Sequence, residues 1–592
     1  MDADARNTRT ATTAATTVWG APDGFDALLL VKRAREHNGP VLHVAKDDAA
    51  LNRLGEALDY MGEKTEVLRF PAWDCLPYDR VSPNPVLIAE RVATMTRLLE
   101  PTKAKGGRIV LTTPAALMQR VPPRSAFEGQ SLEVAQGESL DQSFLIELLI
   151  ANGYTRTDTV MEPGEFASRG GIFDLFPAGQ PEPVRLDLFG DEVENIRYFD
   201  PGTQRSTGKA ERLTLRPVSE FSLDPDCISR FRSAWRDQFG QAAATDSLYE
   251  HVSEGRRYTG IEHWLPLFHA DMETLFDYLK NPAISLDHQV DESLAARMEM
   301  VQDHYEARKT PPREGETPYR ALPPHLLYLD RKGWDAALSR FPVTKFSPFA
   351  KPDGAEGIDA GGRLGIMFAK LAPQGEREKV FDLIADYAQQ WAQTKRRCFV
   401  AAWTKGSRER IKTLLMEHRV AVETFDSWDA ASKMKAGPVG LLIFGIDRGF
   451  VGDDIAIVSE QDLLGERIGR PPRKRRRADE LISEAGEITE GDLVVHQDYG
   501  IGRYDGLETV SVGVAPHDCL RLLYDGGQKL YLPVENIELL SRFGSDQAGV
   551  ALDKLGGVAW QARKSKMKER IRDMAGALIR TAAARALREA PS

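Results

Sequence analysis

Residues 171–200, GIFDLFPAGQPEPVRLDLFGDEVENIRYFD, decide the fold of the region around them. They contain three apolar runs, GIFDLFP, VRLDLF and ENIRYFD, separated by Pro and Gly. That spacing is typical of consecutive antiparallel strands joined by tight turns. The preceding run SFLIELLIANGY (143–154) predicts a helix that ends at Gly153. Residues 132–218 are therefore expected to form a separate α+β unit.

The chain on both sides of this unit alternates between helical and strand patterns. A helix over DALLLVKRAREHNGP (26–40) is followed by a strand at Val41–Ala45, and Arg108–Thr113 is a further strand. Such alternation predicts a parallel sheet with helical crossovers. We expect residues 18–131 and 219–345 to form one α/β domain with the α+β unit inserted. Residues 346–464, with CFVAAW and VGLLIFGID as strands, are expected to form a second α/β domain.

The composition changes sharply after that domain. The run RIGRPPRKRRRADE has seven Arg or Lys residues between Arg467 and Arg477, so residues 465–488 are expected to be an exposed basic linker. Short strands with a hairpin signal at Asp525-Gly526-Gly527 predict a small SH3/Tudor-like β-barrel over residues 489–550. Residues 551–592 predict a basic helix, and residues 1–17 a disordered tail. The fold class is thus multidomain α/β.

Composition limits the chemistry of the chain. Apolar residues make up 42% and the formal net charge is -11, so any basic surface must be local. The four cysteines lie far apart with no CxxC pair, which argues against a metal cluster or a disulfide scaffold. The sequence has no apolar run long enough to span a membrane. A cytoplasmic protein with no membrane partner is expected.

Several motifs resemble one known family in order along the chain. GDLVVHQDYGIGRYDGLETV (491–510) resembles the RNA-polymerase-interacting domain of CarD and of the bacterial transcription-repair coupling factors. AWDCLPYDRVSP (72–83) and MEPGEFASRGGIFDLFP (161–177) are similar to the UvrB-homology region of the same factors. The resemblance runs from about Trp19 to Ala590 and implies the amino-terminal half of such a factor. It places the ATP-driven motor of the full-length family beyond Ser592.

The resemblance implies that Arg169, Arg185 and Phe189 bind UvrA. Strand alternation puts Arg185, Asp187 and Phe189 on one face. Two guanidinium groups can hold carboxylates, and the aromatic ring can supply apolar contact area between them. The alternative is that both arginines pair with carboxylates of their own unit, namely Glu165, Asp174 or Asp187.

In the barrel, the resemblance implies that a strand edge pairs with the β subunit of RNA polymerase. The matching position is Val510, with Leu507 and Thr509 nearby. Strand addition takes its affinity from main-chain hydrogen bonds and its specificity from alternate side chains. The alternative is an ordinary core strand of the barrel.

Nucleotide chemistry is not expected in this chain. In the stretch Gly20–Ala27, before the first helix, Asp26 stands where UvrB-like proteins would have the phosphate-binding Lys. Ala27 stands in place of the Ser or Thr that holds magnesium. The sequence predicts no catalytic residue, no metal site and no cofactor, whereas the full-length family uses ATP and magnesium.

Five basic residues could contact DNA phosphates, because such contacts need only charge and reach. They are Arg473, Lys474, Arg475, Arg563 and Lys564; a solvated linker and a solvated helix face are the alternatives. The predicted function is an adaptor of transcription-coupled nucleotide excision repair that docks on stalled RNA polymerase and recruits UvrA. The other hypotheses are an ATP-dependent translocase or helicase of UvrB type and a CarD-like transcription regulator.

Overall fold

The protein is described by a computed structural model that divides into two compact units, residues 1–469 and 470–592. In the first unit the structure describes residues 15–240, 246–309, 319–372 and 379–465. In the second unit it describes residues 491, 493–496, 499–512, 515–533, 540–542 and 552–554. The basic positions Arg473, Lys474, Arg475, Arg563 and Lys564 lie outside these ranges.

The first α/β domain is built on a seven-stranded sheet of order β15-β1-β14-β13-β2-β4-β3. Its paired strands all run parallel, as the alternation of helices and strands predicts. The strands are β1 (Thr16–Trp19), β2 (Val41–Val44), β3 (Glu66–Phe70), β4 (Arg108–Thr112), β13 (Ala283–Leu286), β14 (Val343–Phe346) and β15 (Ile358–Asp359).

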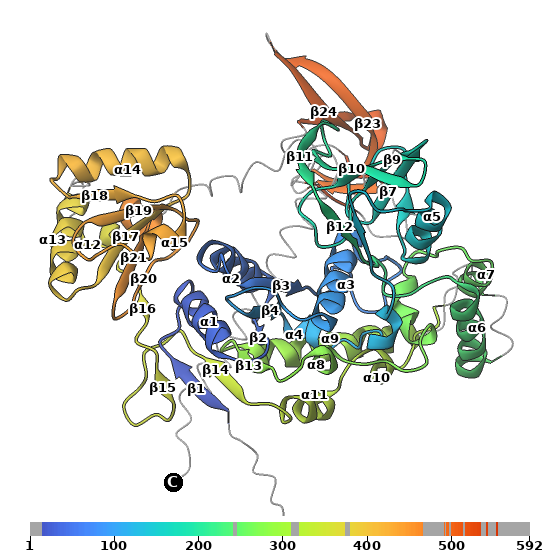
Figure 1. The fold of residues 1–592 in the computed structure, drawn as a ribbon, viewed down its shortest axis with the longest axis horizontal. Coiled ribbons are helices and arrows are strands. Elements are labelled where there is room, and N and C mark those ends of the chain that lie inside the picture. Colours follow the sequence, from blue (N-terminus) through green and yellow to red (C-terminus); the bar gives the residue numbers. More distant parts are fainter. Residues whose placement is uncertain are drawn as a thin grey trace, which may run out of the picture. The chain divides into compact units, whose positions relative to one another are not determined.

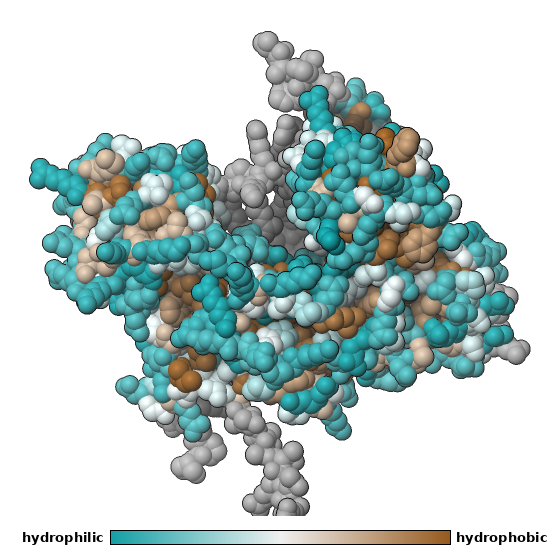
Figure 2. Space-filling view, in the orientation of Figure 1, coloured by the Kyte–Doolittle hydropathy of each residue, from teal (hydrophilic) through white to brown (hydrophobic). Residues whose placement is uncertain are grey.

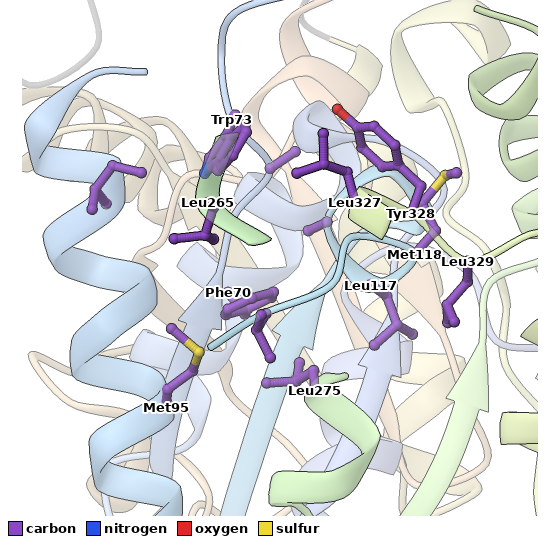
Figure 3. Close-up of a cluster of buried hydrophobic side chains, with 14 of the residues drawn as sticks. Phe70, Trp73, Met95, Leu117, Met118, Leu265, Leu275, Leu327, Tyr328 and Leu329 are labelled. Carbon is purple, nitrogen blue, oxygen red and sulfur yellow. The ribbon is translucent and has the colours of Figure 1, made fainter. Parts of the chain in front are cut away.

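Helices cover both faces of this sheet (Figure 1). On one face α1 (Phe25–Glu36) and α2 (Asp48–Met61) pack on Val41 and Ile109. The adjacent strand residues point to the other face, toward α3 (Pro85–Leu99) and α9 (Val290–Lys309). In that second core, Phe70 lies among Met95, Leu265 and Leu275 (Figure 3). Burial on both faces explains why the strand sequences are continuously apolar.

Further helices complete this domain. They are α4 (Pro114–Leu117), η1 (Arg124–Phe127), α6 (Pro225–Phe239), α7 (Ser247–Ser253), η3 (Ile261–Leu267), α8 (Leu275–Tyr278), α10 (Pro324–Leu327) and α11 (Arg331–Leu338). Within the described residues, no helix combines the length and apolar character needed to cross a membrane.

Two predicted boundaries of this domain are wrong. Thr16 and Thr17, assigned to the disordered tail, begin β1 and pair with Thr344 and Lys345 of β14. β15 also belongs to the first sheet, so that sheet continues beyond the predicted boundary at residue 345. β15 is the edge strand and β1 lies next to it; they have two and four residues, so neither gives a clear apolar run in the sequence.

The inserted α+β unit has a six-stranded sheet of order β11-β10-β9-β8-β7-β6. The three predicted strands are present as β8 (Ile172–Leu175), β9 (Val184–Phe189) and β10 (Glu192–Phe199). The predicted helix is α5 (Gln142–Ala151), capped by the Asp141 side chain. The unit also contains β5 (Leu132–Ala135), β6 (Thr155–Arg156), β7 (Glu165–Arg169), β11 (Ser206–Ala210) and β12 (Arg212–Leu215), with β5 paired to β12.

The second α/β domain has a six-stranded sheet of order β16-β20-β21-β17-β19-β18. The predicted strands are present as β17 (Arg397–Ala402) and β19 (Val439–Ile443), which pair in parallel. The other strands are β16 (Arg363–Leu364), β18 (Val422–Thr424), β20 (Phe450–Val451) and β21 (Ile455–Ser459). The helices are α12 (Phe368–Leu371), α13 (Lys379–Gln393), α14 (Lys405–Glu417), α15 (Trp428–Ala431) and α16 (Glu460–Leu464).

The second unit contains five antiparallel strands of order β25-β24-β23-β22-β26. They are β22 (Leu493–His496), β23 (Gly500–Val512), β24 (Ala515–Leu523), β25 (Lys529–Pro533) and β26 (Leu540–Arg542). The predicted turn is the short helix η4 (Asp525–Gly527) between β24 and β25, where Gly526 and Gly527 have positive φ. The strand content agrees with the prediction, and closure into an SH3/Tudor-like barrel stays a prediction.

Candidate functional site

The sheet of the inserted unit has one face packed on α5 and one face turned away from it, here called the outer face. Along β9, Val184, Leu186 and Leu188 are buried in the core shared with α5. Arg185 and Asp187 are half-buried on the outer face, and Phe189 is 80% exposed. The predicted alternation is therefore correct, and it follows from the pleat of the strand.

Arg185 is held by a carboxylate of the neighbouring strand. Its Nε donates to Oδ1 of Asp174 at 2.6 Å and its Nη2 to Oδ2 at 2.8 Å. The guanidinium also stacks over Phe199, 5.0 Å from the ring centre. The hydrogen bonds to Asp174 raise the pKa of Arg185. This side chain therefore pairs internally, as the alternative interpretation expects.

The other two carboxylates have different partners. Asp187 accepts hydrogen bonds from Arg197 of β10, the shorter at 2.6 Å. Glu165 accepts from the backbone N–H groups of Met161 and Glu162. Arg169 donates to the backbone oxygen of Asp158 and is exposed. Internal pairing with a carboxylate is thus found for Arg185, whereas Arg169 donates to a backbone oxygen instead.

Arg169 and Phe189 lie at one end of the outer face, where two tight hairpins meet. Gly170 and Gly190 take positive φ in these hairpins, which favours glycine. Arg169 is the cross-strand partner of Ile172, and Ile172 is the partner of Asp187. Ile172 is 44% exposed. We call Arg169, Ile172 and Phe189 the hairpin tip; Figure 2 shows apolar side chains at the surface over this end of β9 and over α5.

The second predicted surface lies on β23. Leu507 and Val510 pair with Leu520 and His517 of β24 on one side. On the other side β22 pairs only with Gly500–Arg503, so among the described residues no strand pairs with that edge from Leu507 to Val512. Leu507 is 55% exposed. An unpaired edge presents the N–H and C=O groups that strand addition needs.

The segment before α1 turns at Gly24, which has a positive φ. Asp26 Oδ1 accepts hydrogen bonds from the N–H groups of Gly24 at 2.8 Å and Ala27 at 2.7 Å. The carboxylate therefore occupies backbone donors that a phosphate would use at a helix start. Burial raises the pKa of Asp26 well above its usual range, and nearby Asp23 and Asp287 raise it further.

The adjacent cavity is small. It has a volume of about 110 Å³, and its lining includes Trp403 and Ile446 of the second α/β domain. Ligand pockets for molecules of drug size are roughly 300–1,000 Å³. No group of three or more metal-ligating side chains occurs in the part of the chain that the structure describes.

Three segments match known domain families. Residues 132–221 match the UvrB interaction domain, residues 391–463 the MFD D3 domain, and residues 488–544 the CarD-like/TRCF RID domain. The transcription-repair-coupling factor of Escherichia coli K12 is 33% identical over 573 residues, which are 95% of this chain and 48% of that protein. The factor of Haemophilus influenzae is 31% identical over 94% of this chain and 48% of its own length. That of Bacillus subtilis is 26% identical over 93% and 47%.

This chain is similar to transcription-repair-coupling factors over nearly all of its length. It spans about half the length of the curated relatives it matches. The UvrB interaction match precedes the CarD-like match, in the order that the sequence motifs predicted, so the resemblance is confirmed. The share of each relative that is matched, 48%, is consistent with the prediction that the chain corresponds to one half of a coupling factor.

Both sets of predicted docking residues fall inside matched domains. Arg169, Arg185 and Phe189 lie in the segment that matches the UvrB interaction domain. Leu507, Thr509 and Val510 lie in the CarD-like segment. The individual roles of these residues stay predictions, and so do the DNA contacts.

Sequence reasoning missed two side chains on the outer face. Ile172 belongs to the run GIFDLFP, where it was taken only as part of a strand. Its place directly after the Gly170-Gly171 turn could have indicated that it is exposed at a hairpin end. Arg197 was missed because its pairing with Asp187 depends on the register between β9 and β10, which shifts at a bulge between Val193 and Asn195.

Proposed function

We propose that this chain is a two-ended adaptor of transcription-coupled nucleotide excision repair in the cytoplasm. Its inserted unit recruits UvrA through the hairpin tip and the adjoining outer face. Its CarD-like domain binds the β subunit of a stalled RNA polymerase through β23. The observation that carries the proposal is the presence of one solvent-facing surface in the segment that matches the UvrB interaction domain and one in the CarD-like segment.

The exposed ring of Phe189 supports the UvrA end of the adaptor. An aromatic side chain that is 80% exposed gains no core packing where it stands. Burial against a partner would remove its apolar area from water, and the neighbouring Arg169 would provide the charged contact. We assign the first contact with UvrA to these two residues.

The open edge of β23 supports the polymerase end. Its backbone groups can extend the five-stranded sheet by one strand from the β subunit. Leu507 would contribute an alternate apolar side chain to that strand pair. We assign the polymerase contact to Leu507, Thr509 and Val510.

We propose further that the chain acts by binding and has no ATPase of its own. The internal hydrogen bonds of Asp26 and the small cavity beside it support this assignment. ATP and magnesium would then serve only the motor of full-length coupling factors. The basic positions 473–475, 563 and 564 would at most add nonspecific phosphate contacts.

A bridging assay tests the adaptor. Immobilised RNA polymerase is incubated with the full chain and then with UvrA, and retention of each protein is measured. The wild-type chain should retain UvrA on polymerase. An Arg169→Ala/Phe189→Ala chain should bind polymerase and lose UvrA, whereas Ile150→Ala, which truncates an exposed apolar residue on α5, should retain both. Equal UvrA retention by the wild-type and double-variant chains would refute the assignment of this face.

A further inference from the structure

The outer face of the inserted sheet has three zones along its strands. At one end Val160, Ala167, Phe176 and Phe199 form a small buried cluster. In the middle, carboxylates and arginines are already paired with each other. At the other end the hairpin tip is exposed. The first zone is already buried, so a partner protein can meet only the middle zone and the hairpin tip.

Separating the paired charges of the middle zone is energetically unfavourable. The Asp174–Arg185 pair has two hydrogen bonds, and both side chains are largely shielded from water. A third contact holds Arg185 in place, because its guanidinium group stacks over the ring of Phe199. A partner carboxylate that captured Arg185 would have to leave Asp174 half-buried without its cation, which is strongly unfavourable. Direct capture of Arg185 is therefore a poor source of affinity.

The hairpin tip can be desolvated at much lower cost. Ile172 and Phe189 are 44% and 80% exposed, and neither has a polar group to satisfy. Ile172 lies opposite Asp187 on β9, so Phe189, two residues farther along that strand, is its diagonal neighbour. Diagonal neighbours of this kind lie about 7–8 Å apart, within reach of an aromatic side chain. Arg169 stands opposite Ile172 on the remaining side.

We propose that Ile172 and Phe189 form a joint apolar anchor for UvrA, with Arg169 as the direct cationic contact and Arg185 as a positioning residue. The proposal rests on the adaptor function above and adds Ile172 to its binding residues. The site fits a partner surface that offers an apolar pocket next to a carboxylate. The paired charges of the middle zone then form the polar rim that keeps water from such an anchor.

Titration of UvrA against the full chain tests the anchor. Ile172→Ala should weaken UvrA binding about ten-fold, as expected for a buried interface residue. Ile150→Ala, a truncation of the same residue type at 59% exposure on α5, should leave affinity unchanged. If Ile172→Ala binds like the wild type while Arg169→Ala/Phe189→Ala loses binding, the anchor is wrong and the adaptor stands. If that double variant also binds normally, the adaptor itself fails.

The salt dependence of UvrA binding separates the two arginines. Arg169→Ala should flatten the loss of affinity with rising salt, because it removes a charge that contacts the partner. Arg185→Ala should weaken binding while leaving the wild-type salt dependence. A flattened profile for Arg185→Ala would make Arg185 a direct contact and overturn its positioning role.

A charge exchange gives an independent measurement. Asp174→Arg/Arg185→Asp preserves the cross-strand pair with its polarity reversed. It should restore binding to within about three-fold of wild type if Arg185 acts only through the pair, relative to the roughly ten-fold loss for Arg185→Ala. Failure to restore binding in a double variant that melts like the wild type would contradict the positioning role.

Discussion

Arg185 and Asp174 face each other across β9 and β8 and share two hydrogen bonds, of 2.6 and 2.8 Å. The pair joins the two strands that flank the hairpin tip. It is also a fixed part of the outer face before any partner arrives. The residues that we propose to bind UvrA and the residues that hold their strands in place are therefore different members of one sheet.

Asp174→Asn should loosen these strands. The change removes the anionic partner of Arg185, and a hydrogen-bonded pair of this kind, largely shielded from water, contributes roughly 1–2 kcal/mol. Amides of β8 and β9 should then exchange with deuterium about ten-fold faster or more in hydrogen-exchange mass spectrometry. Glu192→Gln, at the exposed end of β10, should leave the exchange of both strands unchanged. Equal exchange in Asp174→Asn and the wild type would mean that the pair adds nothing to the sheet.

Asp26→Asn should stabilise the protein at neutral pH. The raised pKa of Asp26 means that the folded state favours the protonated acid. Its favourable contribution is complete at low pH and is lost as the pH rises above about 4, where the unfolded chain ionises freely. The amide does not titrate, and its oxygen can still accept from Gly24 and Ala27. The melting temperature of the variant should therefore exceed that of the wild type at pH 7, and the difference should shrink toward pH 4.

His43 should contribute to acid sensitivity of the first domain. Burial lowers the pKa of His43 to about 4, and its ring makes a 3.0 Å hydrogen bond with Ser285. The stability from keeping this ring neutral is complete above about pH 6.5 and is lost as the pH falls toward 4, by at most about 3 kcal/mol. His43→Asn should lose less stability than the wild type in urea unfolding between pH 7 and pH 4.5. A parallel loss in both proteins would mean that the pKa of His43 is the same in the folded and the unfolded state, and would contradict the prediction.

The secondary structure was predicted most accurately where a local sequence pattern alone determines it. The β8–β10 runs have alternating side chains and glycine turns, so strands, faces and hairpins followed directly. The place of Thr16 could not be predicted, because β1 pairs with Thr344 more than three hundred residues later and has no apolar pattern of its own. The exposed tip was predicted only through Arg169 and Phe189. Whether Arg185 is free or paired depends on cross-strand register, which the pattern of a single strand does not contain.

ATP with magnesium should leave the melting temperature of the full chain unchanged. A ligand that binds the folded state at a hundred times its Kd would add about 2.7 kcal/mol to the free energy of unfolding. Asp26 already occupies the backbone donors before α1, so no such gain is expected. DNA-stimulated ATP hydrolysis by the purified chain should likewise equal the background rate. Stabilisation by ATP, or hydrolysis abolished by changes at Asp23 or Gly24, would revive the translocase hypothesis.

Proline scanning along β23 can locate the polymerase contact. Successive N–H groups of a strand point to opposite edges, so of Thr509 and Val510 one donates toward β24 and the other toward the open edge. Proline at the residue whose N–H group donates toward β24 should break the hairpin. Proline at the residue whose N–H group points to the open edge should leave the domain folded and remove only an edge donor. The variant whose circular dichroism matches the wild type should bind RNA polymerase at least about ten-fold more weakly, since each edge hydrogen bond lost from an added strand leaves a partner carbonyl unsatisfied. Its UvrA affinity should be unchanged, because the hairpin tip belongs to a different domain. Normal polymerase binding by that folded variant would exclude strand addition at this edge.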